Sequence, residues 1–173
     1  NEDRQNLSAS SYSVTVTDNN LCSVATSVIL TEQLALTFNE THTHVLCSGG
    51  ATGSIVAVAG GGTSPYNFIW SDGNTNSNRS NLIAGNYSVT LNDNNSCSAS
   101  LSVTINEPAA LAVAETHMDA TCFGTSTGSI DVTVSGATSP YTYLWNDAAT
   151  SEDRNSVASG NYSVTVSDNN LCT

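Results

Sequence analysis

Lysine is absent from this 173-residue chain, and only three arginines oppose fifteen aspartate and glutamate residues, giving a net charge of −12 at pH 7. So acidic a surface repels phosphate backbones and anionic lipids, which excludes nucleic acid as an expected partner. No apolar run approaches the ~18 residues that a membrane helix needs, so no membrane insertion is expected in this segment. There is also no CxxC pair and no zinc-finger spacing of Cys and His.

The chain is organised by a repeat of 75 residues. One stretch occurs three times, at residues 11–22 (SYSVTVTDNNLC), 86–97 (NYSVTLNDNNSC) and 161–172 (NYSVTVSDNNLC). Other positions recur at the same interval, Trp70 with Trp145 for example. A fixed period indicates a modular array, and ~75 residues are enough for a small domain.

The repeated stretch predicts a β-hairpin. Tyr and Val alternate with Ser and Thr, the period of a half-buried strand, and Asp-Asn-Asn then marks a turn. Further strands are expected at 54–59 and 66–70, followed by an irregular polar crossing at 71–80, a short segment at 82–83 and a last strand from Leu111. No stretch has helical periodicity. The prediction is an all-β chain of tandem immunoglobulin-like β-sandwich repeats.

Several recurring side chains are expected to be structural. The tryptophans share their strand faces with Phe68 and Tyr143, which favours core packing over a sugar-stacking platform. The tyrosines take the position of a tyrosine corner. The three arginines are the only Lys or Arg residues of the chain, and they occupy the same position in each copy of the repeat. They are expected to pair with a carboxylate inside a repeat or across the joint between repeats. These candidates are Trp70, Trp145, Tyr12, Tyr87, Tyr162, Arg4, Arg79 and Arg154.

The sequence begins and ends inside a repeat, so we expect a segment of a longer array. Residues 1–47 would be the C-terminal part of a first repeat, 48–122 a complete repeat, and 123–173 the N-terminal part of a third. Boundaries at 1–33, 34–108 and 109–173 are the alternative division.

The cysteine-to-tryptophan segment at 122–145 (CFGTSTGSIDVTVSGATSPYTYLW), followed by GNYSVTVSDNNLC, resembles the SprB-type repeat of Bacteroidetes cell-surface adhesins. The chain departs from the family pattern at the glycine before the second cysteine, replaced by Leu21, Ser96 and Leu171, and at Glu-Pro, which is Glu32-Gln33 in the first copy. The resemblance implies export by the type IX secretion system and a part in gliding motility, attachment or biofilm formation.

Five cysteines, at positions 22, 47, 97, 122 and 172, indicate an oxidising, extracellular setting. Two pairing schemes are open: Cys47–Cys97 with Cys122–Cys172 inside repeats, or Cys22–Cys47 with Cys97–Cys122 between them. The first would place its cysteines at opposite poles of a sandwich, roughly 20–30 Å apart, too far for a disulfide. If residues 111–121 fold back on 97–105, Cys97 meets Cys122. The second scheme is therefore favoured.

Chemistry-bearing patterns are few. No nucleophile elbow, phosphate loop or Ser/His/Asp spacing recurs, so we expect no enzyme activity. Asp72, Asn74 and Asn76 place oxygen ligands at alternate positions, as in a calcium loop, but the copy at 147–153 lacks this series. A solvated loop without a cofactor is favoured over calcium. His42 and His44 are expected to be exposed strand residues rather than a metal pair.

Three functions are weighed. The first is a non-catalytic structural or adhesive stalk in a large repetitive extracellular surface protein, whose partners are neighbouring repeats, surface polysaccharide or other cells. The second is an accessory spacer or carbohydrate-binding module of a large secreted hydrolase. The third is a subunit of a self-assembled extracellular fibre.

Overall fold

The computed structural model describes residues 3–173, and among these residues it contains strands but no helix. The described part of the chain accordingly has no helix that is long and apolar enough to span a membrane. The strands are β1 (Ser10–Thr17), β2 (Ser23–Leu30), β3 (Thr37–Thr43), β4 (Gly53–Gly60), β5 (Asn67–Trp70), β6 (Asn78–Leu82), β7 (Gly85–Asn92), β8 (Ser98–Ile105), β9 (Ala112–Met118), β10 (Gly128–Ser135), β11 (Thr142–Trp145), β12 (Arg154–Val157) and β13 (Val164–Ser167).

The middle of the chain forms a sandwich of two antiparallel three-stranded sheets, β3-β4-β6 and β5-β7-β8. In immunoglobulin terms these are strands A, B and E facing strands C, F and G. Strands β3 and β8, the first and last of the sandwich, are also in contact. The predicted all-β, immunoglobulin-like fold is confirmed.

The core of this sandwich follows from strand alternation. In β7, Val89 and Leu91 are buried while Ser88 is exposed. On the other strands, Ile55 of β4 and Ile105 of β8 are also buried, and Trp70 at the end of β5 is 2% exposed. Alternate apolar residues on both sheets therefore meet in one layer, and the tryptophan lies inside it.

A tyrosine corner lies at the start of β7 and of its two counterparts. The Tyr87 hydroxyl donates to the carbonyl of Ile83 at 3.0 Å. Tyr162 donates in the same way to Ala158 at 3.1 Å, and Tyr12 to Ser8 at 3.0 Å. In the middle and third units the bond fixes the chain where it crosses between the two sheets, and the first unit has the same bond beside its single hairpin.

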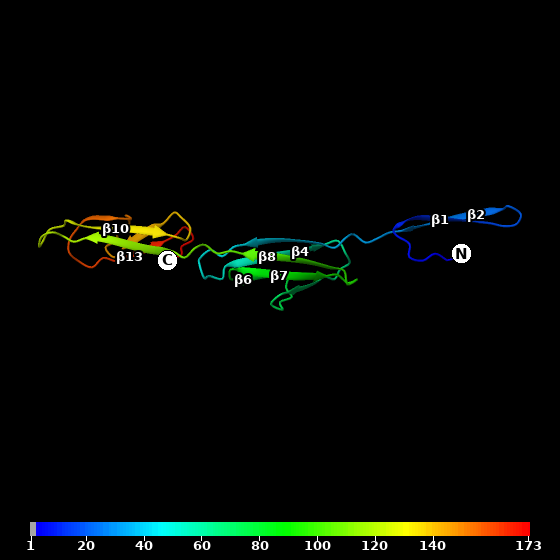
Figure 1. Cartoon of the computed structure of the whole chain (residues 1–173), viewed down its shortest axis with the longest axis horizontal. Helices are drawn as coiled ribbons and strands as arrows, with labels where there is room; N and C mark the ends of the chain where they lie inside the picture. Colours follow the sequence, from blue (N-terminus) through cyan, green and yellow to red (C-terminus); the bar gives the residue numbers. More distant parts are fainter. Residues whose placement is uncertain (1–2) are drawn as a thin grey trace.

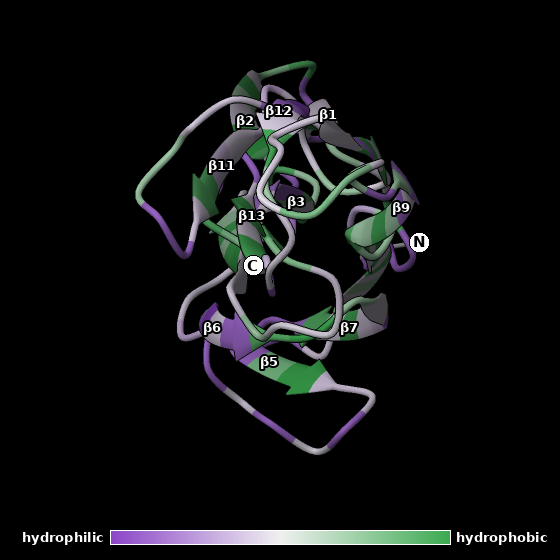
Figure 2. Cartoon of the chain, turned by 90° about the vertical axis from the view of Figure 1, so that its left-hand side faces the viewer, coloured by the Kyte–Doolittle hydropathy of each residue, from purple (hydrophilic) through white to green (hydrophobic). Residues whose placement is uncertain are grey.

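Strand β6 begins inside the segment expected to be an irregular crossing. Apart from Leu82 its residues are polar, which is why it is mostly hydrophilic in the view along the long axis (Figure 2). Backbone pairing with β4, Ile55 opposite Arg79 and Val56 opposite Asn78, makes it a strand. Side-chain alternation therefore carries no signal for this element.

Strand pairing also defines the units used below. Because β3 pairs with β4 along its whole length, a cut at residue 47 would separate two paired strands. We therefore describe a first unit (residues 3–33), a middle unit (34–108) and a third unit (109–173); residues 1–2 of the expected first repeat lie outside the described residues.

The first unit is the hairpin β1-β2, and the third has the sheets β12-β10-β9 and β11-β13. The three units follow one another along a single line, with the middle unit between the other two (Figure 1). The C-terminal residue lies close to the connection between the middle and third units, while the turn of the β1-β2 hairpin points away at the opposite end.

Candidate functional site

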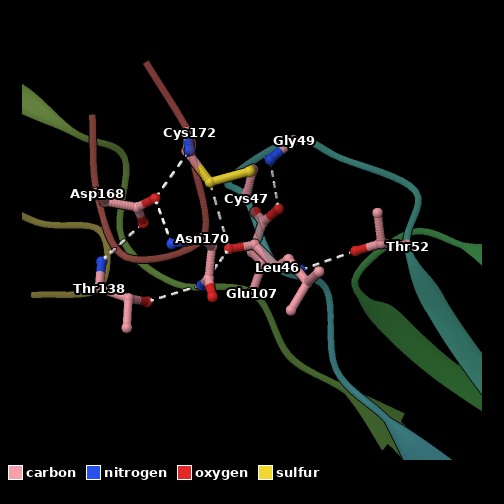
Figure 3. Close-up of a disulfide and its surroundings, with 9 residues drawn as sticks. All are labelled: Leu46, Cys47, Gly49, Thr52, Glu107, Thr138, Asp168, Asn170 and Cys172. Atoms are coloured by element: carbon pink, nitrogen blue, oxygen red, sulfur yellow. Dashed lines mark hydrogen bonds between the residues drawn. A yellow bond between two sulfur atoms is a disulfide. The ribbon is translucent and has the colours of Figure 1, made fainter. Parts of the chain in front are cut away.

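The joint between the middle and third units is the most elaborate site of the described chain. A disulfide joins Cys47, in the loop after β3, to Cys172, in the turn after β13, with a Cα–Cα distance of 5.7 Å (Figure 3). The two residues are 125 positions apart in sequence. One bond thus holds the end of one unit against the end of the next.

The loop that carries Cys47 is fixed by its own hydrogen bonds. The Leu46 amide donates to Thr52 Oγ1 at 2.8 Å, and the Gly50 amide donates to the Cys47 carbonyl at 2.9 Å. The Gly49 amide donates to the carboxylate of Glu107 at 2.6 Å, and Glu107 belongs to the connection that follows β8. Gly49 has a φ of +71°, a conformation that favours glycine.

The turn that carries Cys172 is built around Asp168, whose side chain is 2% exposed. Its carboxylate accepts from the amides of Cys172 at 2.8 Å, Asn170 at 2.9 Å and Thr138 at 3.0 Å. Burial raises the pKa of this carboxyl, but the backbone donors from Cys172, Thr138 and Asn170 outweigh burial and leave it below its usual value. Asp168 is therefore an ionised acceptor that holds the turn closed.

A side-chain amide crosses the joint beside the disulfide. Asn170 Nδ2 donates to the Leu46 carbonyl of the middle unit at 3.0 Å and to Thr138 Oγ1 of its own unit at 3.2 Å (Figure 3). Turn and loop are thus linked by a covalent bond and by a hydrogen bond next to it.

The connecting segment, residues 106–111, is attached to both units. On the middle-unit side the Val45 amide donates to the Asn106 carbonyl at 2.9 Å, and the Asn106 amide donates to His44 Nδ1 at 3.2 Å. On the third-unit side the Ala137 amide donates to the Ala109 carbonyl at 2.8 Å. Because both halves of this short segment are bonded, the two units are held in one relative orientation.

The expected disulfides are not formed. Neither Cys22–Cys47 nor Cys97–Cys122 is present, nor are Cys47–Cys97 and Cys122–Cys172; Cys22, Cys97 and Cys122 have no disulfide partner among residues 3–173. The favoured scheme assumed that residues 111–121 fold back on 97–105. Instead β9 pairs with β10 of the next unit and runs onward, which carries Cys122 away from Cys97.

Arg79 and Arg154 each pair with a carboxylate inside their own unit. Arg79 Nη2 lies 2.5 Å from Asp72 Oδ2, and the Arg79 guanidinium lies 5.0 Å from the centre of the Trp70 ring and 5.8 Å from that of Tyr87. The hydrogen bond from Arg79 is the first cause that lowers the pKa of Asp72 below its ordinary value. The arginine therefore covers the edge of the core and makes no contribution to the joint.

The third unit repeats this cluster, since Arg154 pairs with Asp147 at 2.6 Å and lies 5.3 Å from the Trp145 ring and 5.8 Å from the Tyr162 ring. The hydrogen bond from Arg154 likewise lowers the pKa of Asp147. In the first unit Arg4 lies over the Tyr12 ring at 5.2 Å.

The calcium candidates are engaged in turn hydrogen bonds. Asp72 Oδ1 accepts from the Asn74 amide at 3.1 Å, and Asn74 Oδ1 accepts from the Asn76 amide at 2.8 Å. The Arg79 guanidinium already supplies a positive charge at Asp72. Among the described residues, no three His, Cys, Asp or Glu side chains are grouped as metal ligands.

The histidines divide between two roles. His42 Nδ1 lies 3.0 Å from the Glu40 carboxylate on β3, and its ring centre is 4.9 Å from that of His44. His44 follows β3 and accepts from the connecting segment, a role that sequence reasoning missed. Its counterpart in the third unit is Asp119, so the repeat gave no signal for it.

A cavity of about 750 Å³ lies in the third unit against Ile130, Val132, Trp145, Val157 and Val164. In the middle unit, Val103 and Ile105 of β8 are buried in the core. Among the described residues of the third unit no strand takes the place of β8 beside β13. The cavity therefore corresponds to the position of a sandwich strand.

Residues 39–75 and 114–150 match the family model of the SprB repeat. The chain carries two SprB repeats. Their matched segments are offset by the 75-residue period, and each runs from the first strand of a unit past the loop cysteine and the tryptophan to the loop of the arginine-bound aspartate. No curated protein matches the chain. The SprB repeat is a structural repeat rather than a catalytic domain, and SprB repeats occur in cell-surface proteins.

Proposed function

We propose that this chain is a stalk segment of a large, repetitive bacterial surface protein that acts in attachment, gliding or biofilm formation. The SprB repeats would space and orient a distal part of the same polypeptide, and the segment itself would be non-catalytic and free of cofactors. Its partners would be neighbouring repeats and, at the cell surface, polysaccharide or other cells.

The observation that carries this proposal is the line of units with a fixed joint. The middle and third units are joined by the Cys47–Cys172 disulfide, by the Asn170 hydrogen bond and by a connecting segment bonded at both ends. A spacer needs this property because a flexible connection would let the units fold back and shorten the reach.

Composition supports an extracellular position. The net charge of −12 disfavours contact between neighbouring stalks, and the disulfide suits an oxidising compartment. The aspartates of the two ion pairs, Asp72 and Asp147, and most loop carboxylates are exposed, so their charges contribute to solubility.

The experiment uses intact cells of the source organism and an antibody against this chain. The expected result is surface labelling that is lost when the cells are treated with external protease. The released polypeptide, on a reducing gel, should be many times the 17.9 kDa of this chain, with most of its identified peptides coming from SprB repeats.

Two results would contradict the proposal. Labelling only after the cells are permeabilised would place the protein inside. A surface polypeptide whose peptides come mainly from a hydrolase domain would make these repeats an accessory spacer of an enzyme.

A further inference from the structure

We propose that the Cys47–Cys172 disulfide is one member of a repeated series, and that Cys97 and Cys122 are open halves of two further links, each of which takes a cysteine from another repeat of the same kind. In every link the turn cysteine of one unit would bind the loop cysteine of the unit before it. The proposal concerns the joint and does not rest on the adhesive role.

The turn that presents Cys97 has the same construction as the turn that presents Cys172. The Asp93 carboxylate accepts from the amides of Cys97 at 2.8 Å, Asn95 at 2.9 Å and Thr63 at 2.9 Å, as Asp168 does in the third unit. The residue before the cysteine has positive φ in both turns, +66° at Ser96 and +64° at Leu171. Cys97 is therefore held on a backbone that already forms this bond elsewhere in the chain.

The hydrogen-bond donor that crosses the joint is also in place beside Cys97. Asn95 Nδ2 donates to Thr63 Oγ1 at 2.9 Å, which matches the bond from Asn170 to Thr138. In the third unit the side-chain amide of Asn170 also donates to the Leu46 carbonyl. A loop docked on Cys97 would offer its corresponding carbonyl to Asn95.

The loop that presents Cys122 likewise matches the loop of Cys47. The Thr121 amide donates to Thr127 Oγ1 at 2.9 Å, and the Thr125 amide donates to the Cys122 carbonyl at 3.2 Å. Gly124 has a φ of +77°, close to the +71° of Gly49. Both halves of the joint are thus preformed without a partner.

Phe123 indicates which surface the partner of Cys122 presents. It follows Cys122, is fully exposed at 108%, and stands where the middle unit has Ser48. At the existing joint Ser48 and Leu171 line one shallow hollow beside the disulfide. A repeat whose turn reads Asp-Asn-Asn-Leu-Cys would place its leucine against Phe123 and remove both from water.

Cys97 and Cys122 are too far apart to form a disulfide with each other. Cys97 precedes β8 and Cys122 follows β9, and these strands run one after the other along the molecule, which separates the cysteines by ~50 Å. Among the five cysteines of this sequence, no pair other than Cys47 and Cys172 has the separation of 125 residues. The partner cysteine therefore has to come from another repeat unit.

Formation of each link is an oxidation. Two thiols form one S–S bond and release two protons and two electrons, and a small-molecule or protein disulfide accepts these and becomes two thiols. The reaction begins when the thiolate of one cysteine attacks that disulfide and forms a mixed disulfide, and the exposed Cys122 is accessible for this attack.

The test is a lengthened chain in which residues 99–173 are repeated once after Thr173, with the copy of Cys122 replaced by serine so that each bond has one assignment. The protein is refolded with reduced and oxidised glutathione, alkylated and mapped by digestion without reduction. The expected result is two bonds, Cys47–Cys172 and Cys122 with the added copy of Cys172, while Cys22 and Cys97 are alkylated.

A matched control carries Cys122→Ser at the original position as well. There the added cysteine should be alkylated while Cys47–Cys172 persists, which reports that the units still fold. Alkylation of Cys122 in the presence of the Cys47–Cys172 bond, or a bond between Cys122 and Cys97, would overturn the proposal. Loss of both bonds in the lengthened chain would overturn it too, because a joint that cannot form twice is not a repeated one.

Discussion

Cys47 and Cys172 belong to different sandwich units, yet their Cα atoms lie 5.7 Å apart and their sulfurs are bonded. The loop that the bond closes contains most of the middle and third units. Closing such a loop stabilises the folded state by about 2–4 kcal/mol through the restriction of the unfolded chain. The joint is therefore a stabilising element as well as a connection.

Gly61 should tolerate alanine less well than Gly73. Both have positive φ, +62° and +81°, so each Gly→Ala change carries the ~1–2 kcal/mol cost of a left-handed alanine. At Gly61 the new Cβ would also meet the Ala35 carbonyl, whereas at Gly73 nothing lies within 4 Å. Urea denaturation should show a larger loss for Gly61→Ala. Equal losses would mean that residues 34–36 are not held against this turn.

Acid should destabilise the chain below pH about 4. The pKa values of Asp72, Asp93, Asp147 and Asp168 are lowered in the folded state, while an aspartate in the unfolded chain titrates near ~3.9. A lowered folded pKa contributes stability above the unfolded value, and this is lost as the pH falls through the folded one. The Tm measured by circular dichroism should be constant between about pH 7 and 5 and should decrease as the pH is lowered further.

Asp93→Asn is the matched variant for the acid dependence. The amide cannot replace the carboxylate that accepts from Thr63, Asn95 and Cys97, so Tm should be lower at neutral pH and should change less on acidification. An acid dependence identical to that of the unchanged chain would show that Asp93 makes no pH-dependent contribution.

Arg79→Met should weaken the middle unit without loosening the joint. Loss of the cation over Trp70 removes roughly 0.5–1 kcal/mol, and the pKa of Asp72 should rise toward its ordinary value because Arg79 is the first cause of its depression. Carboxyl titration by NMR measures the pKa. Small-angle scattering should be unchanged, because Arg79 contacts only its own unit; a broader distance distribution would give the arginine a role between units.

Much of the fold could be predicted because it follows local rules. Alternation in residues 86–105 identified the β7-β8 hairpin, and the position of Tyr87 identified the tyrosine corner. Strand β6 escaped because its pairing with β4 uses backbone groups under polar side chains. The strand begins at Asn78 because this residue pairs with Val56 of β4, which is distant in the sequence.

The joint could not be predicted from spacing alone. Both predicted pairing schemes are compatible with the 75-residue period. The observed separation of 125 residues is equally compatible, because Cys172 is the counterpart of Cys97 one repeat later. The choice depends on whether the chain after Pro108 folds back or continues. That is decided by β9, which pairs with β10 and not with β8. His44 and Asn170 act at the joint through this same placement of the units.

The most direct test of the account is a disulfide map of the intact, non-reduced chain after alkylation and cleavage at arginine and glutamate. Cleavage at Glu40 separates Cys22 from Cys47, so the account predicts that peptide 41–79 is linked to peptide 155–173, while Cys22, Cys97 and Cys122 are alkylated. A link between 80–115 and 116–152, which hold Cys97 and Cys122, would contradict it and would mean that the third unit folds back onto the middle one.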